Sequence, residues 1–226
     1  MRRLCLLVFL CIAAQALLLA QGSSGGLLPA VNINVKANAQ WRLNFRAESR
    51  QNLATGIGEF PTEFRYRYVL TDYSAMVSRK VGLNNTLAGG YLLRVEDGDL
   101  SHRLIQQFTL LQRFPSFRLA HRFSTDQTFG EGLPEFRLRY RAAAEIPLNG
   151  QSVDPGEGYV KLNHEYLVAW EGATTEVEMR IVPFYGYAID KQNKLELGID
   201  YRRANLGGSS ARATYWLSIG WFKQFG

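Results

Sequence analysis

Side chains along most of this chain alternate between apolar and polar. The clearest run extends from Phe136 to Ile146, where every second residue is apolar and most residues between them are Arg or Glu. Similar runs cover residues 41–48, 176–181 and 194–202. A period of two is that of a β-strand, whereas a helix repeats its faces every 3.6 residues. The chain is therefore expected to be an all-β protein.

Weaker alternating runs complete an antiparallel up-and-down β-barrel of about ten strands. Apolar residues occupy even-numbered positions up to Leu70 and odd-numbered positions from Tyr73 onward. A bulged residue within one long strand explains this switch. Counting from Trp41 to Phe225 gives the ten strands, and the short apolar run 31–35 is left over. That run fits either an eleventh strand at the seam or half of an extra hairpin, which would make twelve.

Connections between these strands fall into two predicted groups. Four are tight, and two, residues 51–62 and 124–134, are longer and rich in glycine. Short turns at one end and long loops at the other are typical of outer-membrane barrels, so this asymmetry is expected here. The connection 147–158 is long where this scheme expects a short one. An even strand number predicts that both ends of the barrel lie on the periplasmic side.

The first twenty residues have the layout of a secretory signal peptide. Arg2 and Arg3 precede the apolar stretch 4–19, and Ala20 offers a small residue for cleavage. The apolar stretch is shorter than the roughly twenty residues that a spanning helix needs. The expected organisation is a signal peptide (1–20), an N-terminal segment with one short strand (21–40) and the barrel (41–226). Cys5 and Cys11 fall in the removed segment, which excludes thiol chemistry in the mature chain.

Charge argues against nucleic acid as a partner. The whole chain carries 26 basic and 20 acidic residues, and loss of Arg2 and Arg3 leaves 24 against 20, a net charge of +4. The two signs alternate rather than forming a basic block, which indicates solvated or paired faces.

The alternation alone does not say whether the apolar face of the barrel points outward or inward. A soluble periplasmic barrel that binds an apolar ligand has the same alternation, with its apolar face toward the interior. Two features favour a membrane: the apolar positions are rich in Tyr and Trp, and several strands reach the length needed to cross a bilayer. The predicted location is the outer membrane of a Gram-negative bacterium, with outer-membrane lipid, periplasmic chaperones and the barrel-assembly machinery as partners. The last strand resembles the C-terminal assembly strand of outer-membrane proteins, with apolar positions at Tyr215, Leu217, Ile219, Trp221 and Phe225.

Four stretches also resemble one known family. They are Trp41 to Arg50, Phe136 to Arg141, Tyr166 to Trp170, and Lys194 to Tyr201. The chain resembles the domain-of-unknown-function family twenty-four ninety over nearly all of its mature length. Members of that family are regarded as bacterial outer-membrane barrels, so the resemblance implies a fold and a location. It implies no activity, because its motifs are strand patterns.

Charged residues dominate the polar face, which a transmembrane barrel turns toward its lumen. Interleaved Arg and Glu predict ion pairs across neighbouring strands, with a structural role as lining. An excess of arginine leaves open a narrow, weakly anion-selective path for a small solute. The predicted lumenal ladder consists of Arg42, Arg46, Glu48, Arg65, Arg67, Arg118, Arg122, Arg137, Arg139, Arg141, Glu165, Glu176, Glu178, Arg180 and Glu196.

No catalytic, cofactor-binding or metal-binding residues are predicted. The chain has three histidines, and neither Ser101 beside His102 nor Ser124 near His121 shares a strand face with its histidine. The widely separated histidines also lack metal-ligand spacing. The sequence therefore predicts a barrel protein without assigned chemistry. An outer-membrane enzyme acting on phospholipid or lipopolysaccharide remains the alternative.

Overall fold

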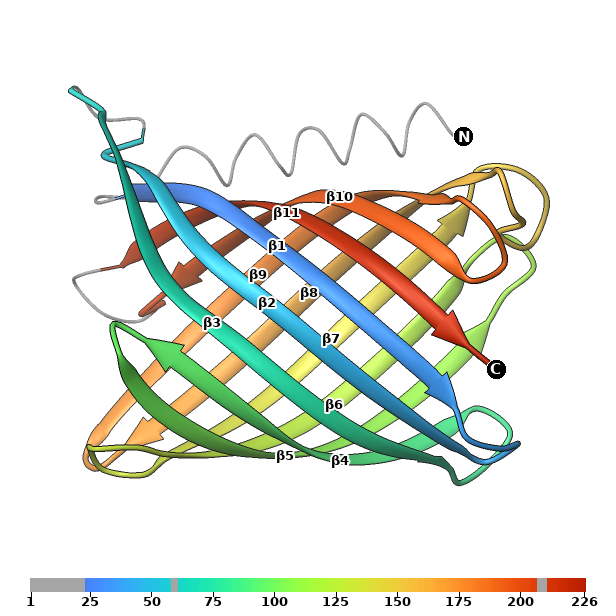
Figure 1. Cartoon of the computed structure of the whole chain (residues 1–226), viewed down its shortest axis with the longest axis horizontal. Helices are drawn as coiled ribbons and strands as arrows, with labels where there is room; N and C mark the ends of the chain where they lie inside the picture. The colour runs from blue at the N-terminus through green and yellow to red at the C-terminus, as the bar shows by residue number, and fades with distance from the viewer. Residues whose placement is uncertain (1–22, 58–60, 207–210) are drawn as a thin grey trace.

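The computed structural model describes residues 23–57, 61–206 and 211–226, and these form a closed barrel of eleven strands (Figure 1). The expected signal peptide, residues 1–20, lies outside the described residues. Each strand pairs with the next one along the chain. The strands are β1 (Ser23–Lys36), β2 (Trp41–Thr55), β3 (Glu63–Lys80), β4 (Asn85–Glu96), β5 (Asp99–Arg113), β6 (Arg118–Phe129), β7 (Glu135–Pro147), β8 (Gly158–Glu171), β9 (Thr174–Ala188), β10 (Asn193–Ala204) and β11 (Arg212–Phe225).

A parallel ladder between the first and last strands closes the barrel. β1 runs beside β11 from Ser23, opposite Ala213, to Val35, opposite Phe225, and pairs with β2 on its other edge in the antiparallel sense. Successive strands alternate in direction, so an odd number makes the first and last strands point the same way. The all-β barrel predicted from the alternation is confirmed, and this seam is its one parallel pairing among the described strands.

Strand β1 confirms the predicted alternative of an eleventh strand at the seam and corrects two other expectations. The ten strands counted from Trp41 are β2 to β11, and the leftover run 31–35 belongs to the eleventh strand at the seam. β1 has 14 residues, so it is a full member of the wall and not a short piece before the barrel. Because the count is odd, β1 begins at one end of the barrel and β11 finishes at the other. The expectation that both ends lie on the same side was therefore wrong.

The two ends of the barrel differ less than predicted. The C-terminal rim, where β11 ends, carries the connections 37–40, 81–84, 114–117 and 189–192, and also the long one at 148–157. The opposite rim, expected to carry long loops, has two-residue turns at Asp97–Gly98 and Gly172–Ala173. Asp97 and Gly98 both have positive φ, at 49° and 99°, the conformation of a tight hairpin turn. Longer strands account for the difference, since β2 reaches Thr55 and β6 reaches Phe129.

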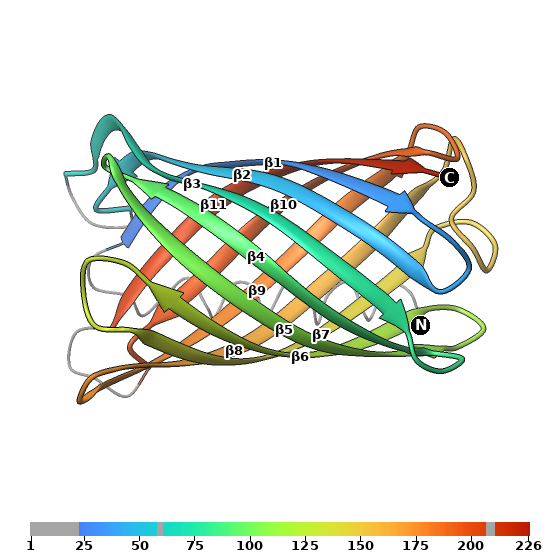
Figure 2. The same cartoon turned by 60° about the horizontal axis from the view of Figure 1, so that its bottom comes forward.

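Strand β3 is a single bulged strand, as its parity switch indicates. The register with β2 shifts between Tyr68 and Leu70, slightly before the predicted position. Pairing with β4 begins only at Leu70, so residues 63–69 pair with β2 alone. In Figure 1 and in the turned view of Figure 2, this part of the β2–β3 hairpin stands beyond its neighbours at the opposite rim.

Aromatic rings pack against glycines on the inner wall near the C-terminal rim. Tyr159 of β8 is buried, and its ring lies over Gly186 of β9, where an added Cβ would lie 2.2 Å from the ring. Phe184 of β9 covers Gly198 of β10 in the same way, with an added Cβ at 2.4 Å. Rings that cover strand glycines restore packing that those glycines lack. This contact aligns β8, β9 and β10 at the C-terminal rim.

Replacing Gly186 with alanine tests this packing. The new methyl group would displace the Tyr159 ring, so we expect the free energy of unfolding to fall by about 1–3 kcal/mol. Gly89→Ala is the matched control, because a Cβ there meets only the Ile105 carbonyl oxygen at 3.9 Å. The measurement is denaturant unfolding of the protein in micelles, followed by tryptophan fluorescence. Equal stability of the two variants would contradict the packing role of Gly186.

Candidate functional site

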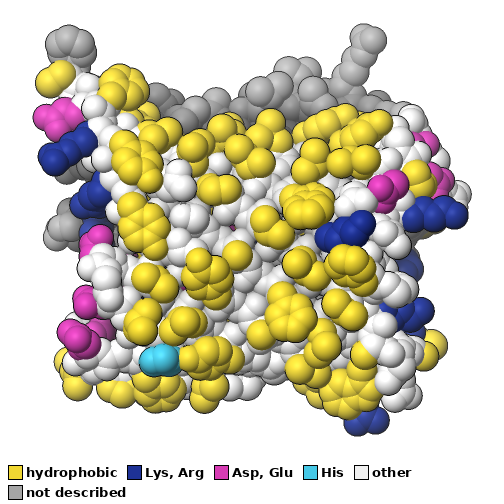
Figure 3. Space-filling view, viewed as in Figure 1, with side chains coloured by type: hydrophobic (Ala, Val, Ile, Leu, Met, Phe, Trp, Pro, Cys, Tyr) yellow, Lys and Arg dark blue, Asp and Glu magenta, His cyan; other side chains and the backbone are white. Residues whose placement is uncertain are grey.

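The barrel turns its apolar face outward. Large apolar side chains on the wall strands are exposed, among them Leu138 at 48%, Leu197 at 51% and Ile199 at 55%. Figure 3 shows one side covered by hydrophobic side chains, with charged side chains gathered toward the two ends. A soluble barrel that holds an apolar ligand has the reverse arrangement. The interior is therefore the polar compartment of this protein, and its charged side chains form the candidate site.

Asp126 is the most deeply buried charge of the interior. Its carboxylate, 1% exposed, lies on β6 opposite Arg137 of β7, and the two side chains form an ion pair of 3.1 Å. Arg139 forms a second ion pair with the same carboxylate. One buried anion thus joins two arginines of the neighbouring strand, an arrangement that compensates the loss of water around all three charges.

Glu165 of β8 connects three strands. It accepts a hydrogen bond of 2.7 Å from Nε of Arg141 on β7, and its other oxygen lies 3.3 Å from Arg180 on β9. Arg180 also forms an ion pair with Glu178 on its own strand. Arg141 lies directly opposite Arg122 in the register of β6 and β7, so two positive charges are neighbours here. Glu165 offsets that repulsion.

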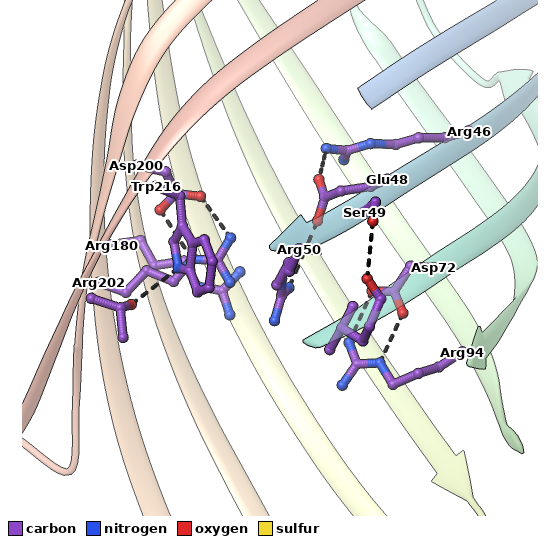
Figure 4. A network of polar contacts seen from close by, with 12 residues as sticks. Arg46, Glu48, Ser49, Arg50, Asp72, Arg94, Arg180, Asp200, Arg202 and Trp216 are labelled. Carbon is purple, nitrogen blue, oxygen red and sulfur yellow. Dashed lines mark hydrogen bonds and ion pairs between the residues drawn. The ribbon is translucent and has the colours of Figure 1, made fainter. Parts of the chain in front are cut away.

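A second network spans strands near the seam (Figure 4). On β2, Glu48 pairs with Arg46 and lies 3.7 Å from Arg50. Arg94 of β4 forms a bidentate contact of 2.8 and 2.9 Å with Asp72 of β3. On the other side of the seam, Asp200 and Arg202 pair within β10, through bonds of 3.0 and 2.7 Å. Bidentate pairs fix both charge and orientation, so these side chains hold defined positions.

Arginine exceeds carboxylate in the central interior. Arg103 of β5 is 4% exposed, and its Nε donates a hydrogen bond of 2.8 Å to Thr128 rather than to a carboxylate. Arg122 forms no ion pair with any carboxylate in the part of the chain that the structure describes. The interior therefore carries positive charge at Arg103 and Arg122 that no ion pair among the described residues neutralises.

Near the C-terminal rim the inner wall is aromatic as well as charged. Tyr159 donates a hydrogen bond of 2.8 Å to Glu196 of β10, and Lys161 of β8 forms an ion pair with the same carboxylate. The Lys161 ammonium also lies 4.5 Å from the centre of the Phe184 ring. These side chains fill one side of the lumen and narrow it at this level.

The structure brings together most, but not all, of the predicted lumenal ladder. Arg65 and Arg67 lie in the exposed part of β3 beyond the barrel, so they do not line the lumen. The bulge near Leu70 and the late start of the β3–β4 ladder explain this error. Glu176 and Arg42 form no ion pair with a described residue, whereas ion pairs involve Arg46, Glu48, Arg118, Arg137, Arg139, Arg141, Glu165, Glu178, Arg180 and Glu196.

Sequence reasoning missed several interior charges. Arg50 continues the even-numbered polar positions of β2, so extension of the strand pattern would have found it. Asp126 was assigned to a connection, because the pattern of β6 weakens after Phe123. No local signal distinguishes Arg103 from an exposed arginine. The interior residues not predicted include Arg50, Asp72, Arg94, Arg103, Asp126, Glu145, Lys161, Asp200 and Arg202.

The histidines lie on the outer face, each beside a tyrosine. His121 contacts the Tyr140 hydroxyl through Nδ1 at 2.8 Å, and His102 contacts the Tyr91 hydroxyl in the same way. The rings of His164 and Tyr166 lie 4.8 Å apart. In the C-terminal strand, Leu217, Ile219, Trp221 and Phe225 are all exposed on this outer face.

Among the described residues, no group of three or more His, Cys, Asp or Glu side chains is arranged to hold a metal ion. The described residues also include no helix of sufficient length and hydropathy to cross a membrane.

Comparison with known proteins identifies a family but no characterised relative. Residues 26–212 match the family described as "Protein of unknown function (DUF2490)". No curated protein matches the chain, and no solved structure matches it either.

Asp126→Asn tests the interior network. The variant keeps the shape of the side chain but leaves Arg137 and Arg139 without their shared anion, and breaking such a buried pair costs about 3–5 kcal/mol. We expect unfolding in micelles at a clearly lower denaturant concentration. Glu131→Gln, in an exposed connection, is the control and should leave the midpoint unchanged. A common midpoint for both variants would show that the Asp126 pairs contribute no stability.

Proposed function

The chain belongs to the DUF2490 family of proteins of unknown function, and we propose that it is an outer-membrane β-barrel protein of a Gram-negative bacterium. The observation that carries this proposal is the two-sided wall. Exposed Leu, Ile, Phe and Tyr cover its outer face, and the arginines and carboxylates face inward. A closed sheet satisfies its backbone hydrogen bonds internally, which is the requirement for crossing a bilayer. Its length supports the same placement, because strands of 12 to 18 residues exceed the roughly nine to eleven that a tilted strand needs.

Export by the N-terminal segment and insertion by the barrel-assembly machinery, after transport by periplasmic chaperones, are part of this proposal. The exposed aromatic and aliphatic positions of β11 support it, because they form the amphipathic closing strand that this machinery recognises. The role within the membrane is structural or at the cell surface. Catalysis is not part of the proposal, since the histidines face outward and each contacts a tyrosine rather than a serine.

A second candidate function is a narrow path for small anions. The uncompensated charges of Arg103 and Arg122 favour it, because they lie in the interior without a carboxylate partner among the described residues. Eleven strands are close to the eight whose interior is filled by side chains and far from the sixteen or more of general porins. A wide aqueous channel is therefore excluded from the proposal.

The orientation of the β7 side chains, toward lipid or toward the lumen, tests the proposed membrane location. Cysteine at position 138 should resist a water-soluble thiol reagent, and a fluorophore attached there should be quenched by lipid-borne nitroxides. Cysteine at position 139, on the inner face, should escape the lipid quencher. Leu138→Arg should also destabilise the inserted protein by about 2–4 kcal/mol, because it places a charge in hydrocarbon. Absence of lipid quenching at both positions would refute a membrane location.

Conduction tests the second candidate. In planar bilayers, purified protein should give small conductance steps or none, because ion-paired side chains and rings narrow the lumen. Where steps occur, the reversal potential in a salt gradient should favour anions, and Arg122→Gln should weaken that preference. Large, stable steps of nanosiemens size would contradict the filled interior.

A further inference from the structure

Two ladders of the barrel wall are interrupted at a proline. Between β1 and β2, pairing stops at Leu27 and resumes at Ala30, and the gap holds Pro29. Between β9 and β10, pairing stops at Gly198 and resumes at Tyr201, opposite Pro183. On their other edges both prolines lie in continuous ladders. Proline has no N–H to donate. Pro29 therefore donates no hydrogen bond to β2, and Pro183 donates none to β10.

The interruptions isolate a panel of three strands, β10, β11 and β1, which includes the parallel seam. Side-chain ties across its edges are few. In the part of the chain that the structure describes, no ion pair joins β1 to β2, and the ion pair of Lys161 with Glu196 is the one that joins the panel to another strand. Asp200 and Arg202 pair within β10 itself. Asp126, Glu165 and Asp72 form ion pairs across other ladders, whereas the β1–β2 edge has a hydrogen bond of 2.9 Å from Asn44 to Asn34.

Buried apolar side chains lie on the inner wall beside each interruption. Val182 lies at the β9–β10 interruption, and Trp216 of β11 pairs with Asp200 of β10. Leu28 lies at the β1–β2 interruption, and Leu70 of β3 lies opposite Arg50 in the register. The side chains of Val182, Trp216, Leu28 and Leu70 are all buried. Each interruption thus combines apolar and charged side chains on the inner wall.

Arg50 lies at the β1–β2 interruption. It lies beside Leu70 in the register and reaches into the space between the Asp200–Arg202 pair and the Asp72–Arg94 pair (Figure 4). Its ion pair with Glu48 is long, at 3.7 Å, and its buried Nε has no hydrogen-bond partner. A guanidinium with free donors, held beside apolar side chains, is suited to an anionic head group.

Hydroxyl groups lie beside the same interruption on β2 and β3. Thr71 donates a hydrogen bond of 3.2 Å to Ser49, and the Tyr68 hydroxyl donates one of 3.0 Å to Thr71. Ser49 falls within the unpaired stretch of β2 opposite Pro29. Ser49 also donates to the Leu70 carbonyl and Tyr68 to the Val95 carbonyl, so the β2 side of the interruption carries polar groups.

We propose that the interruption between β1 and β2 is a lateral port for an amphiphile with one acyl chain and an anionic head. Arg50 receives the head, and the chain lies along Leu28 and Trp216 and passes between the strands into the membrane. Passage of the chain into the membrane rests on the proposed membrane location. Binding of the amphiphile is measured in micelles and does not depend on that location. Failure of one proposal is therefore distinguishable from failure of the other.

Binding is tested with cis-parinaric acid, a fluorescent fatty acid, and with its methyl ester, using the full-length protein in dodecylmaltoside micelles. The acid should bind saturably, and Arg50→Gln should weaken its binding about tenfold or more while leaving the ester unchanged. Arg42→Gln, another inner arginine without an ion pair among the described residues, is the matched control. Arg50→Lys should recover part of the affinity. Competition by dodecanoate and by dodecyl phosphate separates a carboxylate head from a phosphate head.

The route is tested by closing the gap. In a Cys5→Ser, Cys11→Ser background, cysteines at positions 29 and 49 are joined with a short thiol-specific linker, and a pair at positions 87 and 108 in the unbroken β4–β5 ladder serves as control. Linking 29 to 49 should abolish uptake of cis-parinaric acid, whereas linking 87 to 108 should not. Pro29→Ala, which restores the N–H, should slow uptake. Heat-modifiable gel migration verifies folding of each variant. Unchanged uptake after linking 29 to 49, or unchanged affinity in folded Arg50→Gln, overturns the port.

Discussion

Closure of the sheet by the β1–β11 ladder is the constraint on which the rest of this structure depends. An open sheet exposes unpaired N–H and C=O groups along both edges, and in hydrocarbon each of them is costly. An even number of strands would allow an antiparallel seam. With eleven strands the seam is parallel, and parallel pairing is slightly less stable per residue than antiparallel pairing. The register of β1 with β11 nevertheless runs unbroken from Ser23 to Val35, so the seam itself is a continuous ladder.

Closure also determines where the charges lie. Once the apolar face is turned outward, every polar position of the strands faces a narrow interior, where an unpaired charge is unfavourable. The structure meets this condition with carboxylates that each serve two arginines, as Asp126 and Glu165 do. Positive charge still remains at Arg103 and Arg122. The interior charges therefore form ion pairs across neighbouring strands and leave an excess of positive charge in the lumen.

The backbone ladders of the wall are not uniform, and buried apolar side chains lie beside two of their interruptions. Prolines remove backbone bonds at two edges of the panel formed by β10, β11 and β1, and ion pairs do not replace them at the β1 edge among the described residues. At the β1–β2 interruption, buried Leu28 lies beside Arg50, whose Nε has no hydrogen-bond partner. Those features together connect the fold to a ligand that is anionic at one end and apolar at the other.

The sequence by itself determined the strand period, the two faces of the wall and the apolar closing strand, because alternation is a local property of each segment. It also indicated the bulge in β3, since a parity switch is visible within one run. Strand number, the parallel seam and the partners of each charge were decided only by the tertiary structure. Arg139 pairs with Asp126, and Arg141 with Glu165, because the register places those strands side by side. Register follows from the closure of the whole barrel and from bulges and prolines far apart in the chain, so no single segment encodes it.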